Sequence, residues 1–219
     1  MNRDRDRYGV RLPDTADGRS GASLLIERMY TWRGYQGAHE LSDDPHRVTL
    51  TATDKGEVVG TLTIGIDRRS GLMADHMYRD ELDRFRRDHA RLCEVTKLAF
   101  DHSVQSKHAL ANLFHLAFIY ARDIHGCSDA VIEVNPRHRR FYERMLGFRQ
   151  VGPLKINARV DAPSYLLHVN LGYVSAQVER LGGTHSHGLR PGERSLYPYF
   201  FSYDEERGIA ARLLRMEST

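Results

Sequence analysis

The sequence predicts an α/β (α+β) fold in which one mixed central sheet is flanked by helices on both faces. Segments rich in Val, Thr, Leu and Ile alternate with segments whose apolar residues recur at helical spacing. A hairpin is followed by a β-α-β unit and then by a closing pair of strands, an order that one mixed sheet accommodates. A chain of 219 residues with 41% hydrophobic and 28% charged side chains suits one such domain with appendages.

The strands are expected where β-branched and apolar residues alternate or run together. Tyr8, Val10 and Leu12 alternate near the start of the chain, and the turn 54–56 (Asp-Lys-Gly) joins two Val- and Thr-rich segments as a hairpin. The segment DAVIEV indicates a buried strand. The predicted strands are residues 7–12, 47–53, 57–66, 91–100, 129–134, 148–154 and 165–171.

The helices are expected where apolar residues share one stripe. In the longest, Leu110, Leu113, Phe114 and Ala117 lie on one face, and Gly126 follows its end as a stop signal. Gly147 ends the next helix in the same way. The predicted helices are residues 23–33, 74–88, 107–124, 137–146, 173–181 and 205–215.

Three parts of the chain differ in composition. Residues 1–6 alternate Arg with Asp and are expected to form a flexible tail, whereas residues 7–181 contain the strands and helices of the domain. After two adjacent glycines, residues 182–219 are expected to form a linker and an aromatic, helical C-terminal extension. Simple packing is the favoured role for that extension.

Composition excludes several classes of protein. The formal net charge of +3 is too small to predict a nucleic-acid partner. Cys93 and Cys127 form no Cys-x-x-Cys motif, and the pair His185 and His187 supplies too few ligands for a metal site, so none is predicted. The charged start and the lack of any apolar run near ~18 residues predict a cytoplasmic protein without a membrane span.

The strand RLCEVTKLAF places Glu94 and Lys97 in an otherwise apolar run, where charges are costly unless a partner or a site needs them. A partly desolvated glutamate has a raised pKa and suits general-base work on an amine near neutral pH. An ion pair between Glu94 and Lys97 at the end of a sheet explains the pattern equally well. Strand alternation puts the two side chains on opposite faces, unless a bulge changes the register.

The junction from Asp101 to Lys107 leads from this strand into the long helix. A helix N-terminus offers free amides and a positive dipole end, which suit a phosphate or a pantetheine arm. No glycine-rich signature is present at this junction. An ordinary turn capped by Ser103 or Ser106 therefore fits as well.

The segment VNPRHRRFYERMLGF predicts an amphipathic helix with a strongly basic face. Such a face is either simply solvated or a docking surface for an acidic partner or a phosphate-bearing substrate. The arginines concerned are Arg137, Arg139, Arg140 and Arg144.

Two of these segments carry a resemblance to a known family. Residues 131–148, a strand followed by Asn-Pro-Arg-His and FYERMLGF, look like the last helix region of a GNAT-type N-acyltransferase. Together with CEVTKLAFD, they resemble the long-chain N-acyl amino acid synthases of the FeeM type, which are relatives of the acyl-homoserine lactone synthases. The resemblance extends from about Tyr8 to Leu171 and includes GEVVGTL at residues 56–62.

The resemblance implies a GNAT-like acyl-CoA N-acyltransferase fold whose central strands splay apart. It implies a fatty acyl donor on acyl carrier protein, the α-amine of an amino acid as acceptor, and an N-acyl amino acid as product. No bound cofactor is implied, because the phosphopantetheine arrives with the carrier protein. Glu94 matches the family's strand glutamate, and Lys97 falls where the lactone synthases tend to have an arginine.

The site implied in this way combines catalytic, substrate-binding and docking residues. Glu94 would take the ammonium proton, directly or through a water, and a backbone amide near Val95 to Lys97 would hold the developing oxyanion. The arginines of residues 137–144 would receive the acidic carrier protein. The predicted catalytic residues are Glu94 and Lys97, and the predicted substrate-binding residues are Val95, Thr96, Phe100, Ser103, Leu113, Phe114 and Phe118.

The chain departs from the acetyl-CoA-using relatives at one place. Their Gln/Arg-x-x-Gly-x-Gly/Ala loop, which cradles a pyrophosphate, is replaced by DHSVQSKHA at residues 101–109, and this disfavours a CoA donor. The alternatives are an acyl-homoserine lactone synthase using S-adenosylmethionine, a generic GNAT enzyme using acetyl-CoA, and a non-catalytic module that binds a carrier protein.

Overall fold

The structure is a computed structural model that describes residues 8–11, 16–32, 41, 44–104, 106–158, 160–188 and 191–217. The tail predicted for residues 1–6 lies outside them. The strands are β1 (Tyr8–Arg11), β2 (Arg47–Asp54), β3 (Glu57–Ile66), β4 (Leu92–Phe100), β5 (Asp129–Val134), β6 (Arg149–Gln150), β7 (Lys155–Asn157) and β8 (Ala162–Asn170). The helices are α1 (Ala16–Trp32), α2 (Asp75–Arg87), α3 (Lys107–Ile119), α4 (Pro136–Leu146), α5 (Leu171–Leu181) and α6 (Tyr203–Glu217).

The strands form one eight-stranded sheet in the order β1-β2-β3-β4-β5-β8-β6, with β7 paired to β8 beside this path. Only the pairing of β4 with β5 is parallel among the described strands, and every other pair is antiparallel. The α3 crossover between β4 and β5 explains the parallel pair. The predicted mixed sheet and the predicted hairpin of β2 with β3 are confirmed.

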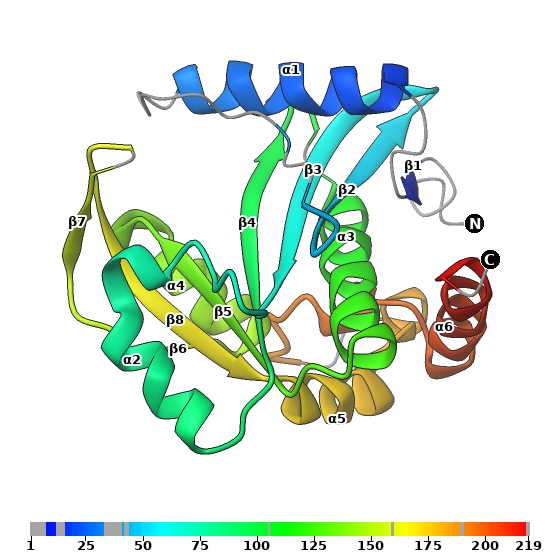
Figure 1. Ribbon diagram of the computed structural model, residues 1–219. Coiled ribbons are helices and arrows are strands. Elements are labelled where there is room, and N and C mark those ends of the chain that lie inside the picture. Colours follow the sequence, from blue (N-terminus) through cyan, green and yellow to red (C-terminus); the bar gives the residue numbers. More distant parts are fainter. Residues whose placement is uncertain are drawn as a thin grey trace.

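Helices cover both faces of the sheet, as predicted (Figure 1). The main core lies where α3, α4 and α5 pack against one face, and Phe114 and Phe118 are at its centre. On the opposite face, Tyr78 and Leu82 of α2 pack against β4, β5 and β8, while α1 packs against the far end of β4. None of the described helices is both long and apolar enough to cross a membrane.

The two central strands diverge. β4 pairs with β5 from Leu92 with Asp129 to Val95 with Ile132, and the ladder ends there although β4 continues to Phe100. Figure 1 shows β4 rising toward α1 while β5 and β8 turn away from it. The splay that the resemblance implied is therefore confirmed.

Local signals explain the helices that flank this splay. Ser106 caps α3, because its Oγ accepts a hydrogen bond from the amide of Ala109 at 3.3 Å. Asn135 caps α4, Pro136 occupies its first turn, and Gly147 ends it in the left-handed conformation with φ of 78°. These residues fix where α3 and α4 begin, and the junctions face the diverging strands.

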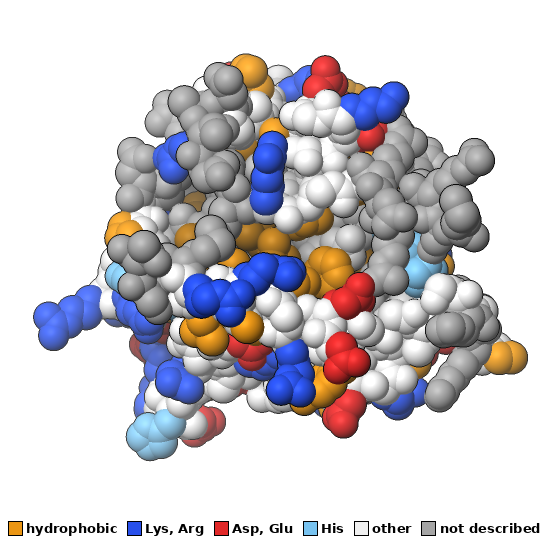
Figure 2. Space-filling view, turned by 90° about the vertical axis from the view of Figure 1, so that its right-hand side faces the viewer, with side chains coloured by type: hydrophobic (Ala, Val, Ile, Leu, Met, Phe, Trp, Pro, Cys, Tyr) orange, Lys and Arg blue, Asp and Glu red, His pale blue; other side chains and the backbone are white. Residues whose placement is uncertain are grey.

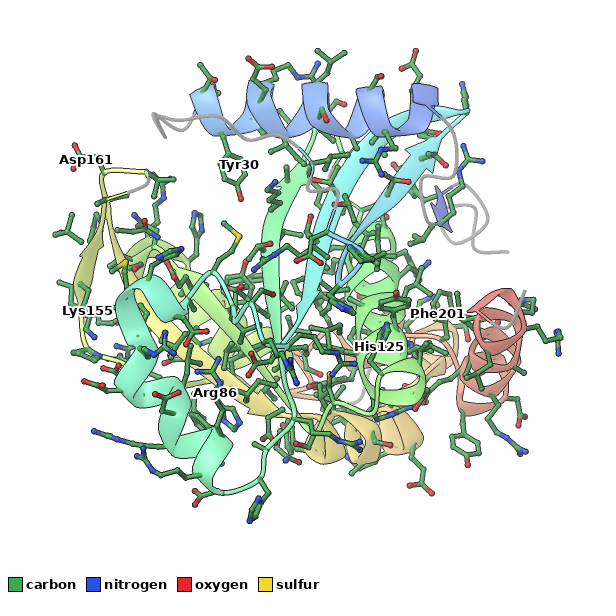
Figure 3. The ribbon with its side chains drawn as sticks, viewed as in Figure 1. Tyr30, Arg86, His125, Lys155, Asp161 and Phe201 are labelled. Atoms are coloured by element: carbon green, nitrogen blue, oxygen red, sulfur yellow. The ribbon has the colours of Figure 1, made fainter. Side chains whose placement is uncertain are left out.

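Some predicted boundaries were wrong. α1 begins at Ala16 rather than at residue 23. The strand predicted over 148–154 shortens to β6, because the chain turns at Gly152, where a Cβ would lie 2.7 Å from the Tyr78 ring. β7 was not predicted. Its Lys155 links it to α2 through hydrogen bonds to the Met77 carbonyl at 2.6 Å and to Glu81 at 3.2 Å (Figure 3).

The C-terminal segment packs onto the main core. Short 3-10 turns cover Thr184–His187 and Tyr197–Tyr199, and a π-helical turn, Tyr120–Ile124, continues α3 toward α6. Tyr197 is buried and donates a hydrogen bond to the Leu146 carbonyl at 2.6 Å. On the side of the molecule that carries α6, hydrophobic side chains gather at the bottom of a surface hollow beside basic ones (Figure 2). The domain boundary at residue 181 stays a prediction.

Candidate functional site

The face of the sheet below α1 is polar although it is buried. Thr49, Thr51, Thr61 and Thr63 of β2 and β3 lie on it, whereas the residues between them face the main core. The hydroxyls of Thr49 and Thr63 are 2.7 Å apart and hydrogen-bonded across the two strands. Buried polar side chains are costly unless they are hydrogen-bonded, so a polar layer of this extent indicates a site.

Glu94 belongs to this polar face and is completely buried. Its carboxylate accepts hydrogen bonds from the backbone amides of Met73 at 2.8 Å and Ala74 at 2.9 Å, just before α2. Arg47 of β2 lies at ion-pair distance, with its Nη1 3.8 Å from Oε2. Glu94 therefore anchors the start of α2 to β4, and both amide bonds stabilise its ionised form.

Lys97 marks a bulge in β4. The register with β3 shifts, since Thr61 pairs with Ala99 but Thr63 pairs with Thr96, and Lys97 adopts φ of 50°. Cys93 and Val95 face the main core before this point, whereas Leu98 and Phe100 face it afterwards. The bulge that would change the strand's alternation is thus present, and Lys97 is the extra residue. Its carbonyl accepts a hydrogen bond from the Thr61 hydroxyl at 2.9 Å.

A cavity of about 560 Å³ lies at the far end of β4, where the central strands have diverged. Its walls come from the end of α1, the β4–α3 junction and the start of α4. Apolar and polar side chains are mixed in it. The lining residues are Met29, Trp32, Phe100, Asp101, His102, Val104, Arg137 and His138.

The polar part of this cavity is organised around Asp101. Its carboxylate accepts hydrogen bonds from the amide and hydroxyl of Ser103 at 2.9 and 2.7 Å and forms an ion pair with Arg28 of α1. The hydrogen bonds from Ser103 and the nearby Arg28 lower the pKa of Asp101. Ser103, predicted to bind substrate, thus shapes the turn before α3. Beside it the His102 ring stands edge-on to Trp32, at 4.0 Å between centroids.

The predicted substrate-binding residues are divided between these regions. Phe100 lines the cavity, and Thr96 lies on the polar face beside Glu94. The remaining apolar residues of the set are packed in the main core on the other side of the sheet, and none lines the cavity. They are Val95, Leu113, Phe114 and Phe118.

The basic helix is α4, and its arginines separate into two groups. Arg137, Arg140 and Arg144 are exposed and recur at helical spacing, so they form one stripe that begins at the cavity. Arg139 points elsewhere, because it bonds Glu143 at 2.8 Å and Gln150 at 2.7 Å. Three of the four predicted docking arginines therefore share one surface.

Sequence reasoning missed most of the cavity and one side of the polar face. Trp32, the single tryptophan, is 67% exposed beside the cavity, and an exposed tryptophan is a usable signal. In β2 the alternation of Arg and Thr with Val and Leu (RVTLTATD) signals a strand with one polar face. Met29, which also lines the cavity from α1, gave no such signal. Tyr30 projects from α1 toward the sheet (Figure 3).

The histidines near the C-terminal turn form an aromatic cluster. His108 of α3 and His185 have ring centroids 4.2 Å apart, and Tyr199 stacks on His185. The side chain of His187 lies outside the described residues. Within the described part of the chain, no group of three or more potential ligands could hold a metal ion.

Diverging central strands, a bulge at the divergence and helices on both faces define the GNAT class of N-acyltransferases. Solved structures agree at the level of the fold. An acyl-CoA N-acyltransferase from Pseudomonas aeruginosa is 13% identical with a TM-score of 0.50, covering 74% of this chain and 97% of that one. An aminoglycoside N(6')acetyltransferase from Legionella pneumophila is 14% identical with a TM-score of 0.53, covering 78% and 96%.

Two further comparisons show the family to which the chain belongs. The family described as N-acyl amino acid synthase FeeM matches residues 21–170. The structure of FeeM, an N-acyl amino acid synthase from uncultured soil microbes, is 28% identical with a TM-score of 0.68, covering 76% of this chain and 91% of that one. No curated protein sequence matches the chain. The chain belongs to the FeeM family of N-acyl amino acid synthases.

Proposed function

We propose that this protein transfers a long-chain fatty acyl group from the thioester of an acyl carrier protein to the α-amine of an amino acid. The observation that carries the proposal is the end of the β4–β5 ladder at Val95. Past this point an extended arm that bears amides can lie along β4 in the place of a strand. Phosphopantetheine is such an arm, and it enters as part of the donor.

The reaction needs a base, a hydrogen-bond donor for the oxyanion and a thioester that the amine can reach. The amine nitrogen attacks the thioester carbonyl, the C–N bond forms, the C–S bond breaks, and the thiolate leaves with a proton. Glu94 is proposed to take the ammonium proton, since a carboxylate that accepts two amide hydrogen bonds keeps lone pairs for another donor. A β4 amide beside the bulge, between Val95 and Lys97, is proposed to hold the oxyanion.

The donor is proposed to reach the site through the cavity. Phe100, Met29, Trp32 and Val104 offer apolar surface to an alkyl or pantetheine chain there. The packed side chains Leu113, Phe114 and Phe118 remain candidates for the acyl end only if the main core opens.

The carrier protein is proposed to dock on the exposed stripe of Arg137, Arg140 and Arg144. The expected carrier protein is acidic, and a basic surface attracts an acidic partner. The stripe begins at the cavity, so the pantetheine arm of a carrier bound there has a short path to β4. We expect the reaction in the cytoplasm, where buried free cysteines such as Cys93 and Cys127 stay reduced.

The test is product analysis of lipid extracts from a bacterial host that expresses the chain or its Glu94→Gln variant. We expect new N-acyl amino acids with the intact chain and at least a 100-fold loss with the variant. Gln keeps one acceptor oxygen for the amides before α2, so the fold is expected to persist. Glu206→Gln, another buried carboxylate with bonded partners, is the control.

Two outcomes would contradict the proposal. If no fatty amide of an amino acid forms with soluble wild-type protein and purified acyl carrier protein thioester, the donor and acceptor assignment is wrong. If Glu94→Gln keeps full turnover, Glu94 is an anchor of α2 and not the base. A product made equally well from acyl-CoA would favour the generic GNAT alternative.

A further inference from the structure

Arg47, Gly65 and Glu94 lie in one row across three neighbouring strands. Arg47 pairs with Gly65 in the β2–β3 ladder, and Gly65 pairs with Glu94 in the β3–β4 ladder. Residues paired in this way project to the same face of the sheet. Because Gly65 has no side chain, the Arg47 side chain extends across it toward Glu94. A Cβ at Gly65 would lie 3.3 Å from Arg47 Nη1.

A second row lies beside the first. Thr49 pairs with Thr63, and Thr63 pairs with Thr96, on the same polar face. Thr49 and Thr63 bond each other, whereas the Thr96 hydroxyl is buried with no hydrogen-bond partner among the described residues. In the described chain, Arg47 Nη1 is likewise buried with no hydrogen-bond partner.

These two groups flank Glu94. Thr96 is two residues along β4 from Glu94, so the side chains share a face, and Arg47 Nη1 is 3.8 Å from the Glu94 carboxylate, beyond a hydrogen bond. The guanidinium is within ion-pair distance of Asp44, at 3.6 Å from Nε, and of Glu94, but its buried Nη1 and the buried Thr96 hydroxyl make no hydrogen bond in the described chain. A buried donor without an acceptor costs free energy, and this cost is recovered when an acceptor group binds it. The acceptor that suits a guanidinium best is a carboxylate or another oxyanion.

We propose that Arg47 and Thr96 bind the α-carboxylate of the amino acid acceptor and so present its α-ammonium group to Glu94. The proposal rests on the proposed function, in which an amino acid is acylated. An α-amino acid carries a cation and an anion one carbon apart, and the row offers a carboxylate and a guanidinium side by side in the complementary order. Arg47 is therefore a substrate-binding residue that selects amino acids over simple amines.

The experiment compares the best amino acid acceptor of the wild type with its α-carboxamide, which keeps the amine and lacks the negative charge. We expect the wild type to prefer the acid in kcat/KM by about 10- to 100-fold, as removal of a charged hydrogen-bond partner predicts. Arg47→Gln and Thr96→Val are expected to raise KM for the acid and to reduce this preference toward unity. KM for the acyl donor is expected to stay unchanged.

Matched variants separate binding from folding. Arg47→Lys keeps the charge and is expected to retain part of the preference, and it replaces Arg47→Gln if that variant is insoluble. Arg68→Gln, at an exposed arginine bonded to the Asp67 carbonyl, is the control and is expected to behave as the wild type. If Arg47 only supports Glu94, kcat falls equally for the acid and the amide with the preference intact, and the proposal is overturned.

A second readout does not depend on turnover. Thermal unfolding is measured with a mixture of standard amino acids and with the corresponding amides. The proposal expects the acids to raise Tm of the wild type more than the amides do, and Arg47→Gln to lose the difference. Equal shifts for acids and amides overturn it. If acids stabilise the protein but no acylated product forms, the proposed function fails while the carboxylate site stands.

Discussion

Arg47 and Glu94 stand two strands apart on the same face of the sheet, with Nη1 of Arg47 only 3.8 Å from the Glu94 carboxylate. The contact is an ion pair without a hydrogen bond. Glu94 has two stronger partners in the amides before α2, so it does not depend on Arg47 to stay buried. Asp44 lies 3.6 Å from Nε of Arg47, on another edge of the guanidinium, so Nη1 retains the capacity to donate a hydrogen bond to another anion.

Gly65→Ala tests whether the Arg47 side chain must cross over Gly65 to reach Glu94. The backbone of Gly65 accepts an alanine, but the new Cβ would lie 3.3 Å from Arg47 Nη1 and displaces the guanidinium. We expect KM for the amino acid to rise about tenfold while kcat changes less, because the displaced group binds substrate. Steady-state kinetics with varied acceptor measures this.

The matched control is Gly208→Ala in α6, where a Cβ would meet nothing within 4 Å. Unchanged kinetics are expected there, together with slightly higher stability, since alanine favours a helix over glycine. If Gly65→Ala has the same KM for the amino acid as the wild type, Arg47 has no contact with the substrate.

Lys97→Asn separates the conformation of the bulge from its charge. Asparagine adopts the left-handed backbone of Lys97 readily, so the register of β4 is retained without the ammonium group. If Lys97 acts in catalysis, kcat falls about 10- to 100-fold with little change in Tm. The check is kcat beside a thermal melt; turnover equal to that of the wild type would mean that Lys97 only shapes the strand.

Replacing Arg137, Arg140 and Arg144 by alanine tests the docking stripe. We expect KM for the acyl carrier protein to rise about tenfold and this KM to depend less on salt concentration. The reason is that charges at the edge of an interface steer association. Replacing Arg79, Arg84 and Arg87, exposed on α2, by alanine changes the net charge equally and is the control. Equal effects of the two triple variants would assign the result to overall charge.

His115→Gln tests a pH-dependent contact between α3 and α6. His115 Nδ1 accepts a hydrogen bond from the Phe201 amide at 3.0 Å, and Nε2 donates one to Glu206 at 2.9 Å. Burial lowers the pKa of His115, and the Glu206 carboxylate opposes this only in part. His115 therefore binds a proton more readily in the unfolded chain than in the folded one. The folded state loses stability as the pH falls through about 6.5, the ordinary pKa of histidine.

Glutamine makes both hydrogen bonds without titrating. We expect Tm of the wild type to fall between about pH 7 and about pH 5 more steeply than Tm of His115→Gln. Burial raises the pKa of Glu206, but the hydrogen bonds from His115 and Arg122 outweigh it and lower that pKa, so Glu206 loses its stabilisation only at lower pH. Parallel melting curves across this window would assign the pH dependence to other groups.

Much of the fold follows from the periodicity of the sequence. The hairpin, the β-α-β unit and α4 with its Asn135 cap and Gly147 stop were predictable, because each has a local signal. The early start of α1 was not, since its first turns contain Gly18 and Gly21, which disfavour helices. Packing on β3, where Gly21 lies close to Val58, overrides that preference.

The site was predictable only in part. Glu94 stands out because it interrupts an apolar strand. Thr96 was named as a substrate-binding residue through the family resemblance, but Arg47 was not predicted. Its position beside Glu94 follows from the register of three strands, which one sequence does not determine. The bulge was foreseen as an option, but Lys97 is not a residue type that marks a left-handed backbone.

The bulge also restricts how this protein can evolve. Deleting Lys97 would remove the bulge and leave Leu98 and Phe100 facing the main core, where Phe100 packs against Gly60. Inserting a second residue beside it would instead turn both side chains to the opposite face. A relative with a one-residue gap at Lys97 would therefore keep the packing of β4 and lose only the bulge, whereas an insertion there would be selected against.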